Sequence, residues 1–174
     1  MAVDLNDLYI QSMVGSRTYY TDFKKSLTSG ATFKELVGLE TLSGGDIKND
    51  YDTYRPFNSD KVYKCQTTQD YGDLVIRTAK MLGINPTVFE DSAAREIFDL
   101  CKKRTKIDLI KCVPIGSSGR YECTIYSGFF GQSNLDNVSQ SETSKGSYTF
   151  VVTDVNEAVG TINSSGVLSL TARS

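Results

Sequence analysis

The stretch "CQTTQDYGDLVIRTAK", residues 65–80, guides the interpretation of the whole chain. Its polar part, residues 67–73, is dense in turn-forming side chains and runs directly into the apolar segment 74–76. Asp, Gly and Thr favour turns through local hydrogen bonds or backbone freedom, whereas branched apolar residues favour strands. The stretch therefore predicts a turn that opens a strand over residues 74–78, and it carries no arrangement typical of a catalytic site.

The length and charge of the chain narrow the class of protein. Its 174 residues fit one domain, residues 1–174, because domains commonly run to about 100–200 residues. Lys plus Arg number 19 and Asp plus Glu number 21, a net charge of −2, whereas general nucleic-acid binders cluster positive charge. No apolar run approaches the roughly 20 residues of a membrane helix, and the acidic N-terminus lacks the apolar core of a secretory signal. We therefore expect a protein that folds where it is made and has no membrane partner.

The absence of histidine is the strongest argument against catalysis. It removes Ser-His-Asp and Cys-His nucleophiles, imidazole acid–base chemistry and histidine metal sites together. The cysteines lack the C-x-x-C spacing of zinc and redox sites. We expect free thiols at Cys65, Cys101, Cys112 and Cys123. The acidic residues at positions 46–52 lack the glycine and closing glutamate of an EF-hand loop, which favours a solvated loop over a calcium site. The sequence thus predicts no enzyme activity, no metal and no cofactor.

Short strands separated by turns dominate the rest of the chain, since β-prone runs alternate with clusters of Gly, Ser, Asn and Pro. The expected strands are residues 8–13, 32–37, 61–65, 74–78, 107–113, 120–127, 147–152, 160–162 and 167–171. The expected linker, long loops and turns are residues 15–30, 46–60, 132–145, 114–119, 163–166 and the vicinity of Asn156. This pattern predicts a mainly β protein: a sandwich or barrel of about eight strands with one flanking α-helix and long polar loops.

The expected helix covers residues 91–103, with Asp91 or Ser92 as its N-cap. Acidic residues lie at its start and Lys and Arg at its end, which complements the helix dipole. Its apolar face is expected to contain Ala94, Ile97, Phe98 and Cys101, with Leu100 beside them. Because that face is one stripe wide, we expect the helix to cover one side of the β core.

Two motifs give the chain a family resemblance. The first is "ATFKELVGLETLSGG", residues 31–45, and the second is "QDYGDLVIRT", residues 69–78. Together they resemble the major tail tube protein of long, non-contractile-tailed bacteriophages, in which an F-x-E-L-x-G-L strand leads to a Gly-Gly turn and a charged loop precedes the next strand. The expected helix and the near-final strand "SYTFVVTD", residues 147–154, also follow the family's order. The chain departs from the family where Asp46 and Ile47 follow the two glycines, in place of Glu and Pro.

The resemblance implies a structural protein of the virion tail that is assembled in the host cytoplasm. Subunits of that family form six-membered rings, which stack into a hollow tube through which DNA leaves the particle. The implied partners are further copies of the chain and the tail tape-measure, terminator and baseplate proteins. DNA would pass without specific binding, which agrees with the weakly acidic charge.

The long loop at residues 46–60 is the candidate site for contact between rings. It is longer than a strand connection requires, and it combines aromatic side chains, which supply contact area at interfaces, with charges of both signs. The candidate contact residues are Asp46, Lys48, Asp50, Tyr51, Asp52, Tyr54, Arg55, Phe57 and Asp60. Three alternatives stay open: a tail terminator, a baseplate hub domain, and a β-sandwich binding module that uses the loops at 46–60 and 132–145.

Overall fold

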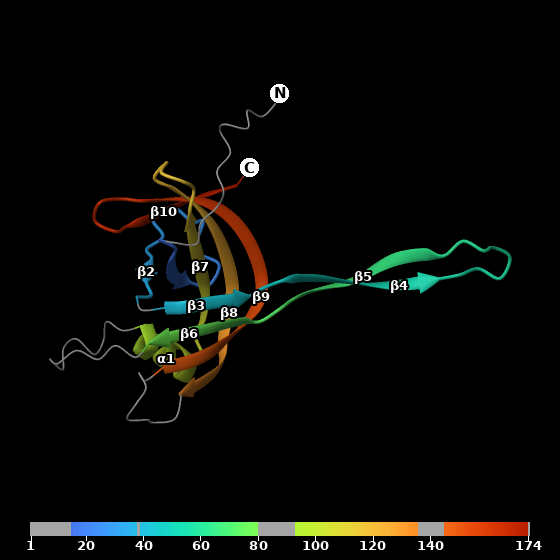
Figure 1. Cartoon of the computed structure of the whole chain (residues 1–174), viewed down its shortest axis with the longest axis horizontal. Coiled ribbons are helices and arrows are strands. Elements are labelled where there is room, and N and C mark those ends of the chain that lie inside the picture. The colour runs from blue at the N-terminus through green and yellow to red at the C-terminus, as the bar shows by residue number, and fades with distance from the viewer. Residues whose placement is uncertain (1–14, 38, 80–92, 136–144, 174) are drawn as a thin grey trace.

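The computed structural model describes residues 15–37, 39–79, 93–135 and 145–173. The strand expected at residues 8–13 lies outside these ranges, as does most of the loop expected at 132–145. Within the described residues the chain forms ten strands and one helix, in two parts that Figure 1 shows plainly: a rounded body and a long arm. The prediction of a mainly β fold with one flanking helix is confirmed.

Eight of the strands form one antiparallel sheet, in the order β2-β1-β7-β8-β9-β6-β3, with β10 also paired to β9. The body strands are β1 (Arg17–Asp22), β2 (Lys34–Glu35), β3 (Leu39–Gly44), β6 (Leu74–Ala79), β7 (Lys106–Pro114), β8 (Arg120–Leu135), β9 (Lys145–Ile162) and β10 (Leu168–Ala172). The remaining strands, β4 (Ile47–Tyr54) and β5 (Tyr63–Tyr71), pair only with each other in a separate two-stranded sheet.

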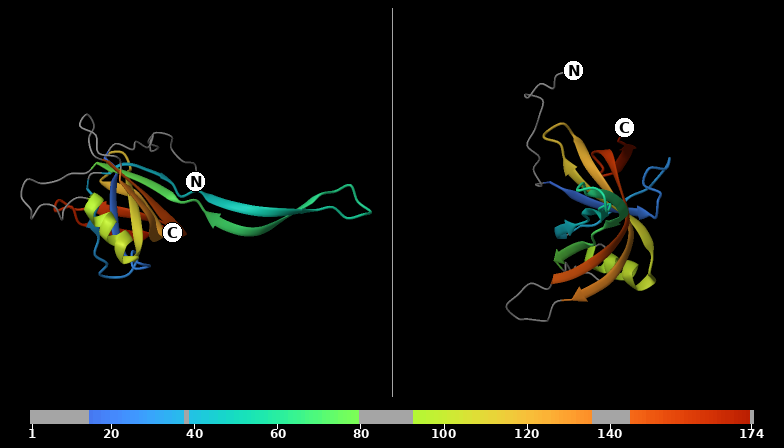
Figure 2. Two further views of the ribbon diagram at one scale, coloured as in Figure 1. Left: turned by 90° about the horizontal axis from the view of Figure 1, so that it is seen from below. Right: turned by 90° about the vertical axis from the view of Figure 1, so that its right-hand side faces the viewer.

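The two longest strands, β8 and β9, run side by side through the whole body. One end of β9 pairs with β6, from Lys145 to Phe150, and the other end pairs with β10. The β8–β9 register shifts between Ser127 and Gly128 and again after Phe130. Bulges of this kind bend a strand and increase its twist, which agrees with the strong curvature of the sheet in the right view of Figure 2.

The curved sheet buries one face at one end and the opposite face at the other end. Successive side chains of a strand point to opposite faces, so one long strand can contribute side chains to both cores. At one end, helix α1 (Ala93–Lys103) packs on a core that includes Leu74, Ile76, Tyr148 and Phe150. At the other end, the opposite face forms a second core. Its buried members are Tyr19, Ile110, Cys112, Cys123, Ile125, Ala158 and Leu168.

The helix covers the β core as predicted, but its buried face was predicted only in part. Ile97 and Leu100 are buried as expected, at 0 % and 9 % exposed, together with Ala93. Phe98 is 38 % exposed, so its assignment to the core face was wrong. It follows Ala93 by five positions, whereas neighbours on one helix face are three or four apart.

Three segments that were expected to be irregular are strands. The expected linker at 15–30 contains β1, whose six residues pair with β7. The turn expected near Asn156 does not exist, because Asn156 pairs with Ile125 inside one continuous β9. Likewise β8 extends to Leu135, into the loop expected at 132–145. In each case pairing with a long neighbouring strand overrides local turn propensity.

A buried carboxylate fixes the segment that follows β1. Asp108, only 2 % exposed, accepts hydrogen bonds from Ser26 Oγ (2.6 Å), Ser127 Oγ (2.7 Å) and the backbone N–H groups of Lys24 (2.9 Å) and Ser26 (3.4 Å). A buried charge requires such partners. These bonds account for the carboxylate as a structural tie between β7, β8 and the segment around Ser26.

Candidate functional site: a projecting β-hairpin arm

The segment predicted as a long loop is one strand and the tip of a β-hairpin. Residues 47–54 form β4, which pairs with β5 from Ile47↔Tyr71 at the base to Tyr54↔Tyr63 near the tip, and residues 55–62 connect the two. We call residues 46–72 the arm. The loop prediction was wrong because the segment is polar on both faces, and the apolar–polar alternation that marks a half-buried strand is missing. The burial pattern explains this, since seven of the eight β4 residues are exposed.

The turn predicted at residues 67–73 is also mostly strand, since β5 continues to Tyr71. The true break is shorter and lies where the body becomes the arm. There the Gly72 N–H donates to the Asp46 carbonyl oxygen at 2.8 Å, opposite two glycines with positive φ, Gly44 at 99° and Gly45 at 75°. The opening stretch therefore serves to let one pair of strands leave the body and return to it.

Both positions need glycine for two reasons: their positive φ, and the lack of space for a Cβ atom. A Cβ on Gly44 would lie 2.2 Å from the Asp73 carbonyl oxygen, and one on Gly45 would lie 2.6 Å from Cε1 of Tyr126. Distances this short do not occur for real Cβ atoms. The base of the arm is thus packed tightly against the body, and glycine is needed for the backbone to pass.

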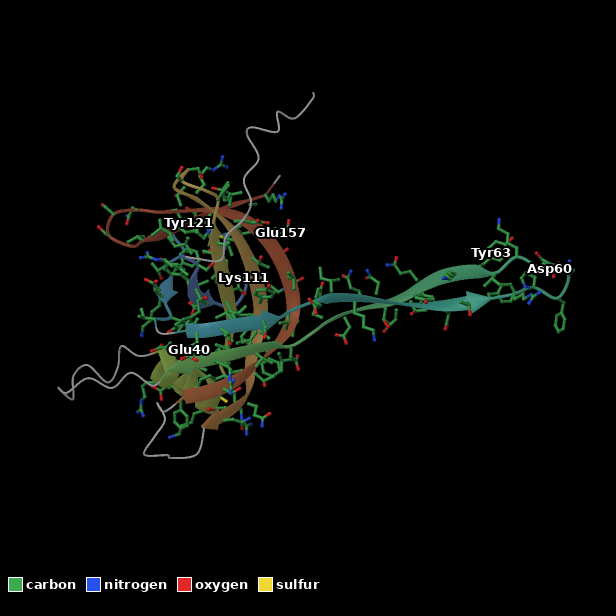
Figure 3. The ribbon with its side chains drawn as sticks, viewed as in Figure 1. Glu40, Asp60, Tyr63, Lys111, Tyr121 and Glu157 are labelled. Atoms are coloured by element: carbon green, nitrogen blue, oxygen red, sulfur yellow. The ribbon has the colours of Figure 1, made fainter. Side chains whose placement is uncertain are left out.

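At its base the arm meets the body, where β5 lies near β9 and Tyr71 packs against the core. Beyond its base the arm projects away from the body, as Figures 1 and 3 show. Six of the eleven exposed large hydrophobic side chains of the described chain lie on it. They are Ile47, Tyr51, Tyr54, Phe57, Val62 and Tyr63, each between 46 % and 113 % exposed. Exposed apolar side chains gathered in one segment mark an interaction surface more often than scattered ones do.

Several charged side chains of the arm have partners within the arm. Arg55 and Asp60 form an ion pair at 3.0 Å across the tip, and Lys48 pairs with Asp50 at 3.4 Å. The ammonium group of Lys64 lies 5.2 Å from the ring centroid of Tyr51. Each such exposed pair contributes at most about 1 kcal/mol. They hold the side chains in place without providing a core.

All nine residues predicted as contact residues lie on the arm. Asp46 is at its base, and Lys48, Asp50, Tyr51, Asp52 and Tyr54 are on β4, with Arg55, Phe57 and Asp60 at the tip. The predicted set does not include Val62, at the end of the connection, or Tyr63, the first residue of the returning strand, although both side chains are exposed. The signal for it was the extended segment expected at 61–65: pairing it with the preceding polar segment would have given a hairpin.

A hairpin of this kind needs support from outside. An isolated two-stranded sheet is marginally stable at best in water, because neither face is covered. The described arm contains no residue classed as buried. Its aromatic side chains therefore gain stability chiefly by burial against another surface.

The cysteines show no metal-binding arrangement. Cys112 and Cys123 lie directly opposite each other on β7 and β8 and share an S–H···S hydrogen bond of 3.1 Å, while Cys65 is exposed on the arm. The pKa of the Cys112 thiol is raised by this hydrogen bond and by burial, which makes the thiol unreactive. Among the described residues no group of three Cys, Asp or Glu side chains could hold a metal ion, and none of the described helical structure is long and apolar enough to span a membrane.

Comparison with known proteins finds likeness in structure alone. No protein-family model and no curated protein sequence matches the chain. Among solved structures, it is similar to a chain of the PVC sheath/tube terminator of an extracellular contractile injection system (TM-score 0.65, 14 % identity, 90 % of this chain and 99 % of that one). It is also similar to a chain of the PVC sheath-tube complex (0.64, 12 %, 90 % and 98 %) and to the SPP1 tail tube (0.59, 9 %, 84 % and 78 %). The chain therefore shares its fold with proteins of tail tubes and tube terminators.

Proposed function

We propose that the protein is the subunit of a tail tube, which assembles with copies of itself into stacked rings. The observation that carries the proposal is the arm: a ribbon without a core that exposes six large hydrophobic side chains. Such a surface is stable when another molecule covers it. A second copy of the chain is the partner that a tube subunit always has beside it.

The sheet of the body supports the same proposal. Its outermost strands are β2, β3 and β10, each of which has one strand partner and one unpaired edge among the described residues. Free edges pair readily with other chains, and closure into a ring removes them. Contacts between two different surfaces that close in a ring and repeat along the axis produce a tube.

The finer proposal is a six-membered ring in the tail of a long, non-contractile-tailed bacteriophage. The tube would conduct DNA during ejection, and the tape-measure, terminator and baseplate proteins would be its partners. The sequence motifs at residues 31–45 and 69–78 and the fold shared with the SPP1 tail tube support this choice. In this proposal the arm reaches from one ring to the next, and its contact residues become buried when rings stack.

A tube terminator is the second candidate. It is favoured by the likeness to the PVC sheath/tube terminator, which has a TM-score of 0.65. A terminator also forms a ring, but growth stops after one ring. The two candidates therefore differ in the length of the assembly.

Negative-stain electron microscopy of the purified protein over a range of concentrations tests the proposal. A tube subunit gives tubes of variable length, a terminator gives single rings, and a binding module stays monomeric. The variant Phe57→Ser is expected to reduce tube length, because it removes a fully exposed aromatic side chain at the tip of the arm. Val167→Ser is the matched control, since Val167 is 56 % exposed on the body. A monomer at all concentrations would overturn the proposal.

A further inference from the structure

Two of the four cysteines face each other inside the body. Cys112 on β7 and Cys123 on β8 are register partners, both are 0 % exposed, and their sulfur atoms are 3.1 Å apart. Gly160 of β9 leaves room for one of these sulfurs, because a Cβ there would lie 2.8 Å from Cys123 Sγ. Cys65 and Cys101, in contrast, lie on β5 of the arm and on α1. The sheet therefore holds one pair of thiols in contact, and the proposed function makes no use of that pair.

The position of the pair in the ladder suits a covalent bond between the two sulfurs. The Ile115 N–H donates to the carbonyl oxygen of Arg120 at 2.9 Å, so these two residues are a hydrogen-bonded pair. Hydrogen-bonded and non-hydrogen-bonded pairs alternate along an antiparallel ladder. Cys112 and Cys123 are three pairs further along and are therefore a non-hydrogen-bonded pair. The Cα atoms of such pairs are about 4.5 Å apart, within the range of roughly 4.4–6.8 Å that a disulfide spans.

We propose that Cys112 and Cys123 are an oxidisable dithiol that closes to a cross-strand disulfide when the folded protein meets a small peroxide. The pair stays reduced in a reducing cytoplasm and becomes a staple between β7 and β8 in an oxidising medium. Lys111 and Tyr121, which lie next to the pair along these strands, are seen in the body in Figure 3. This chemistry belongs to the folded subunit and does not depend on the proposed function.

The two thiols take different parts in the reaction. Once Cys123 has lost its proton, the S–H group of Cys112 donates a hydrogen bond to the charged sulfur, which lowers the pKa of Cys123. The hydrogen bond and burial raise the pKa of Cys112, so Cys112 does not react first. The Cys123 thiolate is therefore the group that attacks the peroxide, because the thiolate and not the thiol is the nucleophile.

The reaction balances with hydrogen peroxide as the oxidant. The Cys123 sulfur bonds to one peroxide oxygen, the O–O bond breaks, and hydroxide leaves and takes up the thiol proton to form water. The Cys112 sulfur then attacks the Cys123 sulfenic acid, and the S–S bond forms as a second water molecule leaves with the Cys112 proton. The two sulfurs are oxidised by two electrons, and the two peroxide oxygens are reduced.

Burial makes this oxidation slow without preventing it. Both sulfurs are closed off from solvent in the intact sheet, so the peroxide has to enter when the strands part. The pair lies close to the hairpin turn, where residues 116–120 are all exposed. Local opening begins at such weakly held ends. After the first step Cys112 is already in contact with the oxidised sulfur, which favours disulfide formation over attack by a second peroxide.

The disulfide is expected to stabilise the body. It joins the strand that pairs with β1 to the strand that pairs with β9, in the middle of the second core. It closes a loop of twelve residues, 112–123, which restricts the unfolded chain. For a loop of this size in a chain of this length, we expect the melting temperature to rise by about 5–10 °C.

Peroxide treatment of the purified, folded chain tests the inference. After incubation with millimolar hydrogen peroxide, the remaining thiols are blocked with N-ethylmaleimide in denaturant, and the chain is digested with trypsin without reduction. Trypsin cleaves after Lys111 and Arg120, so the disulfide joins the peptides 112–120 and 121–145. We expect mass spectrometry to find this linked pair, and a reductant to remove both the link and the rise in melting temperature.

Cys112→Ser is the matched control, because it keeps Cys123 and removes the thiol that closes the bond. Peroxide should give this variant no linked peptides and no gain in melting temperature. If the variant does not fold, the peptide map of the unmodified chain still decides, with the exposed thiol of Cys65 as the internal standard.

Three results would overturn the inference. The first is recovery of both Cys112 and Cys123 as maleimide adducts after Cys65 has been fully oxidised. The second is a disulfide that joins either of the pair to Cys65 or Cys101. The third is a linked pair whose melting temperature is unchanged or lower. The measurement uses the unassembled subunit, so failure of the protein to form tubes would overturn the proposed function and leave this result unaffected.

Discussion

The body and the arm are both antiparallel β-structure, yet different forces hold them. In the body, long strands are covered on one face or the other, and side chains such as Leu74 and Phe150 are fully buried. In the arm, both faces of β4 and β5 meet solvent, and the ribbon is held by its backbone ladder and a few exposed side-chain pairs. Strand geometry alone therefore does not show which interactions stabilise a region. Substitutions in the body should change folding, and those in the arm should change assembly.

The largest expected difference in stability is between two Ile→Asp variants, one in the body and one on the arm. Ile97→Asp places a charge at a position that is 0 % exposed, on the buried face of α1. Such a charge has no partner and disrupts the core, so we expect a loss of roughly 3–5 kcal/mol in the free energy of unfolding. Ile47→Asp, at a position that is 55 % exposed on the arm, should leave the melting temperature of the monomer within about 2 °C. Equal losses, measured by thermal unfolding, would show that the two regions are not distinct.

Removing a carboxylate should show the same contrast at a smaller scale. Asp108→Ala leaves the buried donors of Ser26 and Ser127 and the part-buried N–H of Lys24 without their acceptor, which should cost about 2–4 kcal/mol. Asp50→Ala on the arm removes a half-exposed carboxylate that accepts from Thr68 Oγ1 at 3.2 Å, and it should cost less than about 0.5 kcal/mol. Denaturant titration of both variants measures these values. A loss for Asp50→Ala as large as that for Asp108→Ala would contradict the comparison.

The boundary between body and arm should respond to a single methyl group. Gly45→Ala puts a Cβ against the ring of Tyr126 at a φ of 75°, and we expect a loss of about 1–3 kcal/mol. Gly166→Ala has a similar φ of 79° with open space around it, so it reports the backbone strain alone, about 1 kcal/mol. If the two variants lose the same stability, the base of the arm is not packed against the body as described.

The smallest expected effect concerns a partly exposed charge network. Burial alone would raise the pKa of Glu96, but hydrogen bonds from Lys34 (2.8 Å) and Tyr20 outweigh it and lower the pKa below 4.5. The unfolded state therefore binds more protons near pH 4, so this contribution is present above pH 4.5 and is lost as the pH falls through the folded pKa. Glu96→Gln should cost less than about 1 kcal/mol at pH 7, since Lys34 is exposed.

The pH dependence supplies the control for that prediction. The stability difference between wild type and Glu96→Gln should shrink as the pH is lowered from 6 to 3, measured by urea unfolding at each pH. A difference that grows on acidification would contradict the assigned pairing.

How much the sequence revealed also differs between the two regions. The strand at residues 74–78 and the turn at 114–119 were predicted, because apolar runs and turn residues mark elements that pack on a core. The helix was also predicted, but Phe98 was wrongly assigned to its buried face. The continuous β9 was not predicted, since Asn156 carries a local turn signal and only the partner strand β8 shows that it is paired.

The arm marks the limit of prediction from sequence alone. Its composition revealed that residues 46–60 were unusual and which side chains were available for contact. Its secondary structure could not be read, because a ribbon that is exposed on both faces has no hydrophobic period. The surface that we propose receives the arm would belong to another subunit, and it leaves no signal in one chain.

Replacing the arm separates its role in assembly from any role in folding. The Gly72 N–H and the Asp46 carbonyl oxygen are 2.8 Å apart, so residues 47–71 can be exchanged for a short Gly-Ser turn. The whole ribbon must be removed, because deleting only residues 47–59 would leave β5 without its partner strand. Tube formation by electron microscopy and thermal unfolding are then compared with those of the unmodified protein. We expect a body that unfolds cooperatively at nearly the same temperature and no longer forms tubes. A variant that forms tubes normally, or a body that cannot fold without the arm, would contradict the account.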